Sequence, residues 1–299
     1  MSGRVLATGA GGFVGGHLLD ALGGDAVACA ADVADGEAVR QALADVRPDA
    51  VIHLAALSSV AQSWRDAAAT WLVNAIGTVN LLDAVAREAR AARVLVVSSS
   101  EVYGRVGDLP VTEDAPVAPI SPYGASKAAA EVAAARAARA DGLDVVVVRP
   151  FAHIGPGQSP TFAVGSWVEQ VAALERAGGG TLLVGDLNVR RDLTDVRDVV
   201  RAYLALLDRA VAPGTYNVAS GRAVALGDVL DALRAAARCP IEVRVDEARL
   251  RANDLPYLCG DASRLAAATG WRPEIDLAAT LQDALAATRA RATDEVESR

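Results

Sequence analysis

The chain has 299 residues, 52% of them hydrophobic, which is enough to bury a large core in one large domain or two closely packed lobes. The formal net charge is −8 and no block of Lys and Arg stands out, so we expect no nucleic-acid partner. We see neither an apolar run of the roughly 18 residues that a membrane span needs nor a signal peptide, and expect no membrane partner and a cytoplasmic location. Three cysteines without metal-ligand spacing and three scattered histidines predict no metal site.

Strand and helix patterns alternate along the first half of the chain. Short β-branched runs, typical of strands covered on both faces, lie at 4–8, 50–54, 93–98 and 144–149. Amphipathic stretches that predict helices lie near 12–22, 36–47, 63–90 and 122–141. This alternation predicts an α/β fold with a doubly wound parallel sheet.

The pattern loosens after Pro150, where Pro and Gly punctuate the chain before a predicted helix at 162–177. We therefore assign a dinucleotide-binding Rossmann domain to 1–150 and a smaller substrate-binding lobe to 151–299. Part of 181–220 is expected to return to the first domain. Ligands of such sheets bind outside the carboxyl ends of the strands, so the crevice between the lobes is the predicted site.

The first predicted strand leads directly into TGAGGFVGGHLL, a glycine-rich turn before a helix. Glycines at this spacing allow a tight turn and a close approach to a pyrophosphate, which the helix N-terminus then binds. The residues predicted to contact the cofactor here are Gly9, Gly12, Phe13, Val14 and Gly15. Asp32 and Asp35 follow the next apolar run so soon that little room is left for a separate second βα unit, and the choice between NAD and NADP stays open.

The heptapeptide SPYGASK predicts the start of a helix, with Ser121 as N-cap, Pro122 in the first turn and Gly142 after its end. Tyr123 and Lys127 would share one face of that helix. Beside an ammonium and the positive end of the helix dipole, we expect the phenol to ionise more easily than its usual pKa of about 10 allows. Such a pair can exchange a proton with a carbonyl or hydroxyl, although a surface Tyr and Lys on an ordinary helix would give the same spacing.

With these two motifs the sequence resembles the extended short-chain dehydrogenase/reductase family. VIHLAA at 51–56, NAIGTVNLLDA at 74–84 and VSSSEVYG at 97–104 are similar to blocks of that family. The resemblance implies NADPH or NADH as cofactor and a catalytic group of Ser99, Tyr123 and Lys127, in which Lys127 also holds the nicotinamide ribose. It further implies cofactor contacts from Asp32, Val33, Leu54, Ala55, Ala56, Ser58, Asn74, Ser98, Tyr123, Lys127, Pro150 and His153.

Segments 149–164, 189–203 and 258–273 resemble the sugar-nucleotide enzymes of this family, most closely those that reduce GDP-4-keto-6-deoxy-D-mannose to GDP-D-rhamnose. This resemblance implies a nucleotide-sugar substrate, with GDP favoured. Guanidinium and amide groups suit its phosphates and hydroxyls. The expected substrate contacts are Ser59, Ser100, Glu101, Gln158, Phe162, Arg191, Arg251 and Asp254, with Asn74 as a further amide. A homodimer is expected through the helices at 63–90 and 125–140.

Three positions depart from the resemblance, namely Ala152, Leu193 and Ala252, and each affects the shape of the ligand site. Two alternatives therefore stay open. A nucleotide-sugar 4,6-dehydratase or epimerase on the same fold would use Glu101 as the catalytic base. A sensor of sugar nucleotides or NAD(P) would keep the fold without turnover, which the joint presence of Ser99, Tyr123 and Lys127 argues against.

Overall fold

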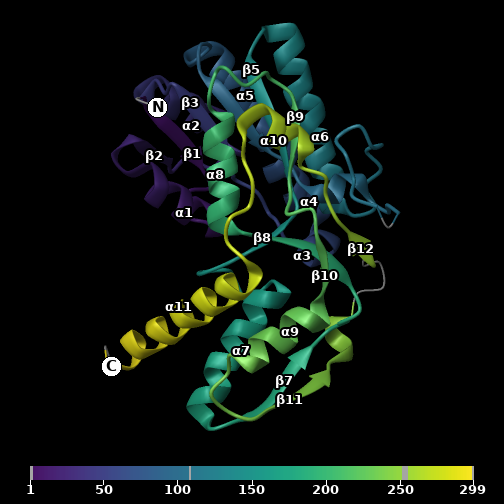
Figure 1. Cartoon of the computed structure of the whole chain (residues 1–299). Coiled ribbons are helices and arrows are strands. Elements are labelled where there is room, and N and C mark those ends of the chain that lie inside the picture. The colour runs from purple at the N-terminus through teal and green to yellow at the C-terminus, as the bar shows by residue number, and fades with distance from the viewer. Residues whose placement is uncertain (1–2, 108, 251–254, 298–299) are drawn as a thin grey trace.

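The computed structural model describes residues 3–107, 109–250 and 255–297. Figure 1 shows an upper lobe built on a parallel sheet and a lower lobe of helices and short strands, with the long strand β8 (Arg190–Asp195) running between them.

The upper sheet has six strands in the order β2-β1-β3-β4-β5-β9, all parallel. The predicted doubly wound α/β fold is confirmed. All residues of β1 and β3 are buried, as near-continuous apolar runs require when helices cover both faces. The strands are β1 (Val5–Thr8), β2 (Ala26–Cys29), β3 (Ala50–His53), β4 (Arg93–Val97), β5 (Asp144–Pro150) and β9 (Thr215–Val218).

Two layers of helices cover this sheet and form two separate apolar cores with it. One core joins the sheet to α1 (Phe13–Leu22), α8 (Val196–Leu206) and α10 (Ser263–Thr269). The other joins it to α2 (Gly36–Val46), α5 (Gly77–Glu88) and α6 (Pro122–Arg136), which ends in the π-turn η4 (Ala137–Asp141). Both β9 and α8 come from the second half of the chain, so the sheet is completed by residues far from its first strands.

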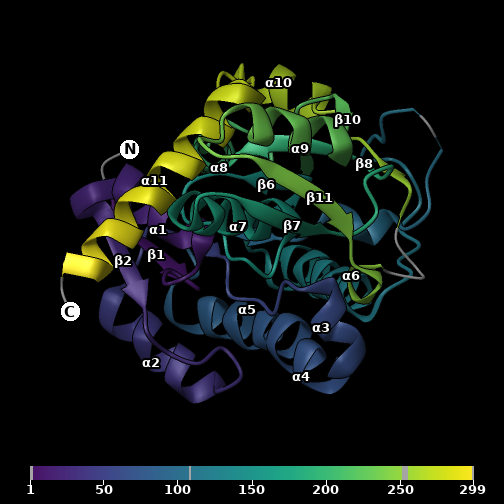
Figure 2. The ribbon, with the colours of Figure 1, turned by 90° about the horizontal axis from the view of Figure 1, so that it is seen from below.

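The lower lobe has its own core between helices α7 (Ala163–Ala177), α9 (Leu226–Ala235) and α11 (Leu277–Glu297) and the parallel pair β7 (Gly180–Val184) and β11 (Ile241–Val245). Figure 2 shows α7, β7 and β11 side by side beneath the upper lobe. Strand β8 pairs with three short strands, β6 (Ala152–Ile154), β10 (Ala223–Ala225) and β12 (Tyr257–Leu258). The remaining single turns are η1 (Gly23–Asp25) and η5 (Glu247–Arg249).

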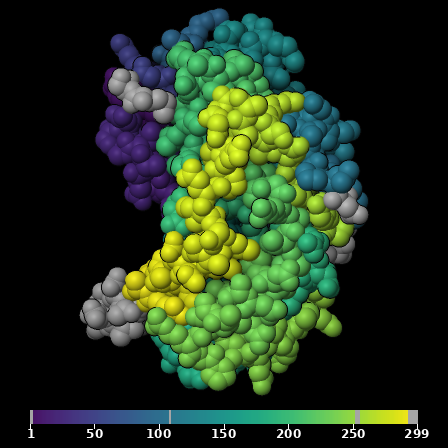
Figure 3. Space-filling model, in the orientation of Figure 1, coloured from purple at the N-terminus to yellow at the C-terminus, as the bar shows by residue number. Residues whose placement is uncertain are grey.

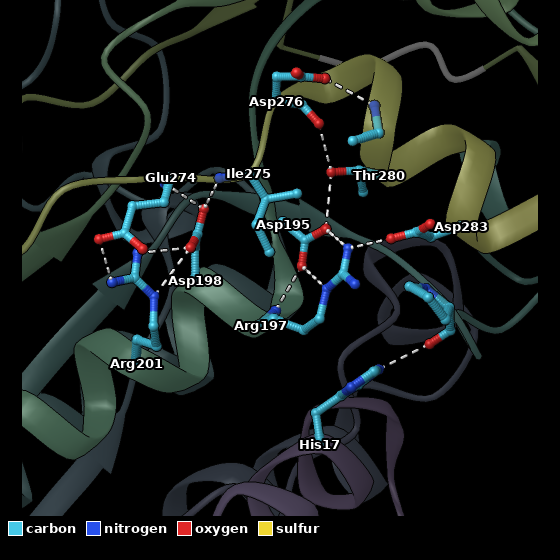
Figure 4. Close-up of polar contacts among 12 residues, drawn as sticks. His17, Asp195, Arg197, Asp198, Arg201, Glu274, Ile275, Asp276, Thr280 and Asp283 are labelled. Atoms are coloured by element: carbon cyan, nitrogen blue, oxygen red, sulfur yellow. Dashed lines mark hydrogen bonds and ion pairs between the residues drawn. The ribbon is translucent and has the colours of Figure 1, made fainter.

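The C-terminal part of the chain crosses the front of both lobes, with α10 on the upper and α11 on the lower (Figure 3). The buried Asp198 at the start of α8 fixes the connection between them, since its carboxylate accepts the backbone amides of Glu274 and Ile275 at 2.8 and 2.9 Å (Figure 4). Arg197 forms an ion pair with Asp283 close by. Both side chains are solvent-exposed, so this pair adds less to stability than the buried Asp198 carboxylate does.

Two expectations about local structure were wrong. A second βα unit does exist, because the short run of four residues in β2 pairs along its whole length with β1, and α2 follows after a six-residue turn. The stretch at 63–90 is also not one helix. It consists of α3 (Val60–Arg65), α4 (Ala67–Trp71), the π-turn η2 (Leu72–Ile76) and α5, since the extended φ of −141° at Asp66 ends α3 and its side chain caps α4.

The continuous helical stretch Ala67–Glu88 is long and apolar enough to cross a membrane by length and composition alone. Half of its apolar window is buried within this fold, where it packs against α2 and α6. A core helix of a water-soluble protein meets the same criterion, so the stretch is weak evidence for a membrane span.

Candidate active site

The glycine-rich turn packs directly on the end of β3. Gly9 has a φ of +68°, and a Cβ atom there would lie 2.6 Å from the Ala55 amide nitrogen. A Cβ atom at Gly15 would lie 2.4 Å from the Ala10 carbonyl oxygen, so neither glycine can be replaced without moving backbone. Gly12 is the N-cap of α1 and offers no side-chain cap, which leaves first-turn amides of the helix available to an anion. The turn therefore fits the pyrophosphate of a dinucleotide.

The residues that follow β2 and β3 form the rest of the predicted cofactor site. Asp32 is exposed beyond β2, where an acidic residue can meet a ribose, and one of its oxygens accepts the Ala34 amide at 2.9 Å. Val33 is buried against Gly77 of α5 and presents no polar group. Leu54, Ala55 and Ala56 follow β3 and are partly buried, and Ser58 is exposed.

A buried histidine, to which the sequence assigned no role, holds these strand ends together. His53 Nδ1 lies 2.8 Å from Thr8 Oγ1 and its Nε2 lies 3.0 Å from Thr78 Oγ1, so the ring bridges β1, β3 and α5. Burial, with a smaller effect of the Lys127 charge, lowers the pKa of His53 to about 3. The ring is therefore neutral and structural. Its only sequence signal is its place at the end of a buried strand.

Helix α6 begins as the sequence predicted. Ser121 Oγ accepts the Gly124 amide at 3.0 Å, a proline occupies the first turn, and Gly142 ends the helical stretch with a φ of +68°. A Cβ atom at Gly124 would lie 2.7 Å from the Glu101 carbonyl oxygen, so this glycine allows α6 to approach η3 (Ser100–Tyr103) closely. Ser63 of α3 accepts the backbone amide of Tyr123 at 3.2 Å and fixes the start of α6 from the other side.

The structure brings the three predicted catalytic residues together at the carboxyl end of β4. The Tyr123 phenol is buried and hydrogen-bonded to Ser99, while the buried Lys127 ammonium donates to the Val97 carbonyl at 2.8 Å. The expected easy ionisation of the phenol was wrong. Burial, assisted by the charge of Glu101, raises the pKa of Tyr123 to about 12 against the opposing effect of Ser99, because desolvation outweighs the favourable contacts.

The pKa of Lys127 is lowered, whereas that of Tyr123 is raised. Burial lowers its pKa to about 8, and the charge of Glu131 opposes that effect. At neutral pH the site thus holds a protonated phenol next to an ammonium that stays charged by a small margin. This arrangement can donate a proton to an oxygen.

Ser100 and Glu101 follow Ser99 and begin η3. Ser99 Oγ accepts a hydrogen bond from the Glu101 backbone amide at 3.2 Å, and this bond fixes the backbone of Glu101 beside the hydroxyl. Ser100 is buried and Glu101 partly buried. The effect of the Glu101 charge on the Tyr123 pKa places this carboxylate within electrostatic reach of the phenol.

Three polar side chains predicted to contact ligand are already used within the protein. Asn74 is fully buried, and its amide bonds both backbone groups of Leu57 and the hydroxyl of Ser126. Ser98 is buried and donates to Glu131 at 2.5 Å, and Ser59 Oγ caps α3. A sequence pattern identifies polar residues near a site, but it does not show that their partners come from within the fold.

The connection after β5 lies against the glycine-rich turn. Pro150 is buried at the end of β5, and the His153 ring stacks on Phe13, with centroids 6.0 Å apart and planes 10° apart. Burial lowers the pKa of His153, which keeps the ring neutral. Val14, next to Phe13, packs on the core of the upper sheet.

The predicted substrate contacts of the lower lobe differ in outcome. Gln158 donates to the His153 carbonyl at 2.8 Å, and its side chain faces α7 and α11, where a cavity of about 10 Å³ has room for one water molecule. The contact of its amide with substrate stays a prediction. Phe162 is the N-cap residue of α7, and Arg191 donates to the Leu255 carbonyl at 2.6 Å. Arg251 and Asp254, and the departure at Ala252, lie outside the described residues.

The other two departures, Ala152 and Leu193, are direct partners in the pairing of β6 with β8. Leu193 packs on the apolar core of the lower lobe. The two departures therefore occur at one place in the fold.

A wide cleft lies elsewhere in the described part of the chain. It has a volume of about 530 Å³ and is lined by α1, α8 and the segment at 274–275. None of the site residues predicted within the described ranges lines it. The figure of this region shows paired charges around Arg197 and Arg201 (Figure 4).

Comparison with known proteins agrees with this geometry. The family model described as GDP-mannose 4,6 dehydratase matches residues 23–284. The chain is 36% identical to GDP-6-deoxy-D-mannose reductase of Pseudomonas aeruginosa, over 99% of this chain and 100% of the relative. It is 33% identical to a UDP-glucose 4-epimerase of Mycolicibacterium smegmatis, over 92% and 95%.

Solved structures give the same grouping. The structure of RMD from Pseudomonas aeruginosa complexed with NADPH superposes with a TM-score of 0.88 at 36% identity and covers 97% of this chain and 100% of its own. The UDP-glucose 4-epimerase of Thermus thermophilus in complex with NAD gives a TM-score of 0.84 at 28% identity, with 96% and 99% covered.

Proposed function

This chain belongs to the GDP-mannose 4,6-dehydratase family, and we propose on that basis that it is an NAD(P)H-dependent reductase of a nucleotide-linked 4-keto-6-deoxy sugar. The favoured reaction converts GDP-4-keto-6-deoxy-D-mannose to GDP-D-rhamnose. The observation that supports it most is the protonated Tyr123 phenol, hydrogen-bonded to Ser99 and next to Lys127, in a chain that matches a reductase over its whole length.

The cofactor would be held by the turn at Gly9–Gly15, by Asp32 and by the residues after β3. When bound, its reduced nicotinamide supplies the hydride that C4 of the sugar receives. Tyr123 gives its proton to the C4 oxygen, so that the C=O group becomes CH–OH. Ser99 donates a hydrogen bond to the same oxygen, and the positive charge of Lys127 stabilises the phenolate left on Tyr123 until solvent returns a proton.

A dehydratase or epimerase is the second candidate, and Glu101 is the observation that favours it. Its carboxylate stands close enough to influence the Tyr123 phenol, at a position from which a base could remove a proton from the sugar. A dehydratase would need Glu101 for its chemistry, whereas a reductase needs only the hydride and the Tyr123 proton.

One experiment distinguishes these reactions. The protein is incubated either with GDP-4-keto-6-deoxymannose and NADPH or NADH, or with GDP-mannose and NAD(P)⁺, and the products are identified by mass spectrometry. We expect gain of two hydrogens in the first incubation and no loss of water in the second. Loss of water from GDP-mannose would overturn the reductase assignment and favour the dehydratase.

We also propose that two copies of the chain pair through the outer face of α3–α6. Apolar side chains are exposed there although their elements pack closely together: Trp64, Trp71, Leu72, Ile76, Val79 and Val132, between 42% and 68% exposed. A continuous apolar surface of this kind is expected to be covered. The proposed location is the cytoplasm, where the free thiols Cys29, Cys239 and Cys259 stay reduced.

A further inference from the structure

The carboxylate of Glu131 lies buried in α6, one helical turn beyond Lys127. It accepts two hydrogen bonds from the Arg149 guanidinium, at 2.9 Å from Nε and 2.7 Å from Nη2, and a third at 2.5 Å from Ser98 Oγ. The side chains of Glu131 and Arg149 are 12% and 7% exposed. A doubly bonded pair this well buried is held in one geometry.

Each partner of Glu131 leads to a segment that carries a proposed catalytic residue. Ser98 directly precedes Ser99 and follows β4. Arg149 also donates to the Tyr103 hydroxyl at 3.0 Å, and Tyr103 closes η3, the turn that contains Glu101. Glu131 itself stands on the helix of Tyr123 and Lys127. The end of β4, η3 and α6 are therefore fixed to one another through this pair.

The charge of Glu131 also reaches Lys127. The groups that interact with Lys127 are Glu131 on its own helix, the neutral His53 on β3 and the Val97 carbonyl on β4. The phenol of Tyr123 stands one helical turn before it. The charge of Glu131 raises the pKa of Lys127, against the stronger effect of burial. Glu131 bonds Ser98 and the Lys127 ammonium bonds the carbonyl of the preceding Val97, so both charged groups meet the same short segment at the end of β4.

We propose that Glu131 is a positioning residue of the reductase, which holds Lys127 in its charged form through space and fixes the Ser98–Ser99 segment through a hydrogen bond. This inference rests on the proposed roles of Ser99, Tyr123 and Lys127. It assigns a function in the reaction to a side chain that contacts neither substrate nor cofactor.

The test follows the charge of Lys127 in Glu131→Gln. Without the carboxylate, the ammonium should lose its proton at a lower pH than in the parent. Two readouts report this change: the alkaline limb of kcat/KM with saturating cofactor, and the pH at which stability to urea begins to rise because buried Lys127 becomes neutral. We expect both to move to lower pH. The second needs no activity, so it decides even if the proposed reaction is wrong.

Three variants complete the design. Ser98→Ala keeps the charge and removes one hydrogen bond, so the rate should fall while the pH midpoints stay in place. Asp144→Asn removes a carboxylate from buried Arg93 at the amino ends of β4 and β5, away from the site. It should lower stability without moving either pH midpoint. If Glu131→Gln does not fold, the paired replacement Glu131→Gln with Arg149→Met removes both charges and is judged by the same midpoints.

If the pH midpoints of kcat/KM and of stability do not move in Glu131→Gln, or in the paired replacement, Glu131 has only a structural role and the proposal is wrong. A parent protein without reductase activity would overturn the proposed function alone, since the rise in stability would still report on Lys127.

Discussion

The Tyr123 phenol forms a hydrogen bond with the Ser99 hydroxyl, although one residue begins a helix and the other follows a strand on a different segment of the chain. Ser99 also accepts the Glu101 amide, so its hydroxyl is held in place from two sides. The bond favours the phenolate, while burial favours the phenol more strongly. The proposed proton donor therefore starts the reaction as a protonated phenol.

Replacing Tyr123 by Phe keeps the ring and removes that proton. Reduction of the 4-keto sugar should fall by roughly 10²–10⁴-fold, the usual contribution of a general acid. Cofactor affinity should change little, because the ring still fills its site. Steady-state kinetics together with titration of NADPH binding would check both, and near-normal turnover at saturating substrate would show that another group is the acid.

Lys127 should make stability depend on pH in a predictable direction. Its pKa is about 8 in the folded protein and close to the ordinary lysine value of 10.5 in the unfolded chain, so between these values the unfolded chain binds more protons. Stability therefore rises with pH above about 8, by about 2–3 kcal/mol up to pH 10. Above pH 10 the raised pKa of Tyr123 works the other way, because the unfolded phenol ionises first.

Urea unfolding at a series of pH values would measure this rise, and Lys127→Met, which carries no charge at any pH, should abolish it. The same substitution should weaken both cofactor binding and turnover. A parent protein whose stability is flat between pH 8 and 10 would contradict the lowered pKa of Lys127.

Much of this site could be predicted from local sequence signals. The cap at Ser121, the spacing of Tyr123 and Lys127, and the glycine-rich turn each depend on residues close together in the chain, where propensity and backbone geometry decide the outcome. The direction of the Tyr123 pKa could not be predicted in this way. It depends on how deeply the phenol is buried, and that burial comes from elements far away in the sequence.

The hydrogen-bond partners of polar residues could not be predicted from the sequence either. Asn74 and Gln158 were expected to meet ligand, yet Asn74 bonds Leu57 and Ser126, and Gln158 bonds the backbone of His153. Glu131 gave no signal, because it lies on helix α6 and its partner Arg149 on strand β5, and only the folded chain brings them together. The second strand was missed since four residues next to a turn carry too weak a pattern, while pairing with β1 supplies the missing stabilisation.

Gly124 should tolerate no side chain. In Gly124→Ala, the new Cβ would lie 2.7 Å from the Glu101 carbonyl oxygen, so α6 must move away from η3. We expect a loss of about 1–3 kcal/mol in stability, the usual cost of overpacking, and a lower rate because Tyr123 moves relative to Ser99. Gly16→Ala is the matched control, since it lies in helix α1 with open space at its Cβ and should be stabilising by up to about 1 kcal/mol. Equal stabilities for both variants would show that α6 and η3 are not in close contact.

The proposed dimer should depend on the apolar face of α3–α6. Val132→Glu places a charge on the most exposed of these side chains, at 68%, on the helix α6 that packs against η2 with the exposed Leu72 and Ile76. Sedimentation of the double variant Ile76→Glu with Val132→Glu should give a monomer where the parent gives a dimer. Leu109→Glu is the control, because Leu109 is 80% exposed in a loop away from this face and its charge should leave the assembly intact. A parent that sediments as a monomer at micromolar concentration would contradict the pairing.

The role of Glu101 decides between the two candidate reactions. A dehydratase must oxidise C4, remove the C5 proton with a base, expel the C6 hydroxyl and return the hydride to C6, so loss of its base costs roughly 10²–10⁴-fold. A reductase needs no such base. Glu101→Gln should therefore leave reduction of GDP-4-keto-6-deoxymannose within about tenfold of the parent, or no more than about 1.4 kcal/mol of transition-state stabilisation. Because the Glu101 charge helps to raise the pKa of Tyr123, the variant phenol should be slightly more acidic, and the small change in rate should come from this effect. Kinetics of both reactions in the parent and in Glu101→Gln would check the prediction, and a water-eliminating activity that disappears in the variant would identify Glu101 as the base of a dehydratase.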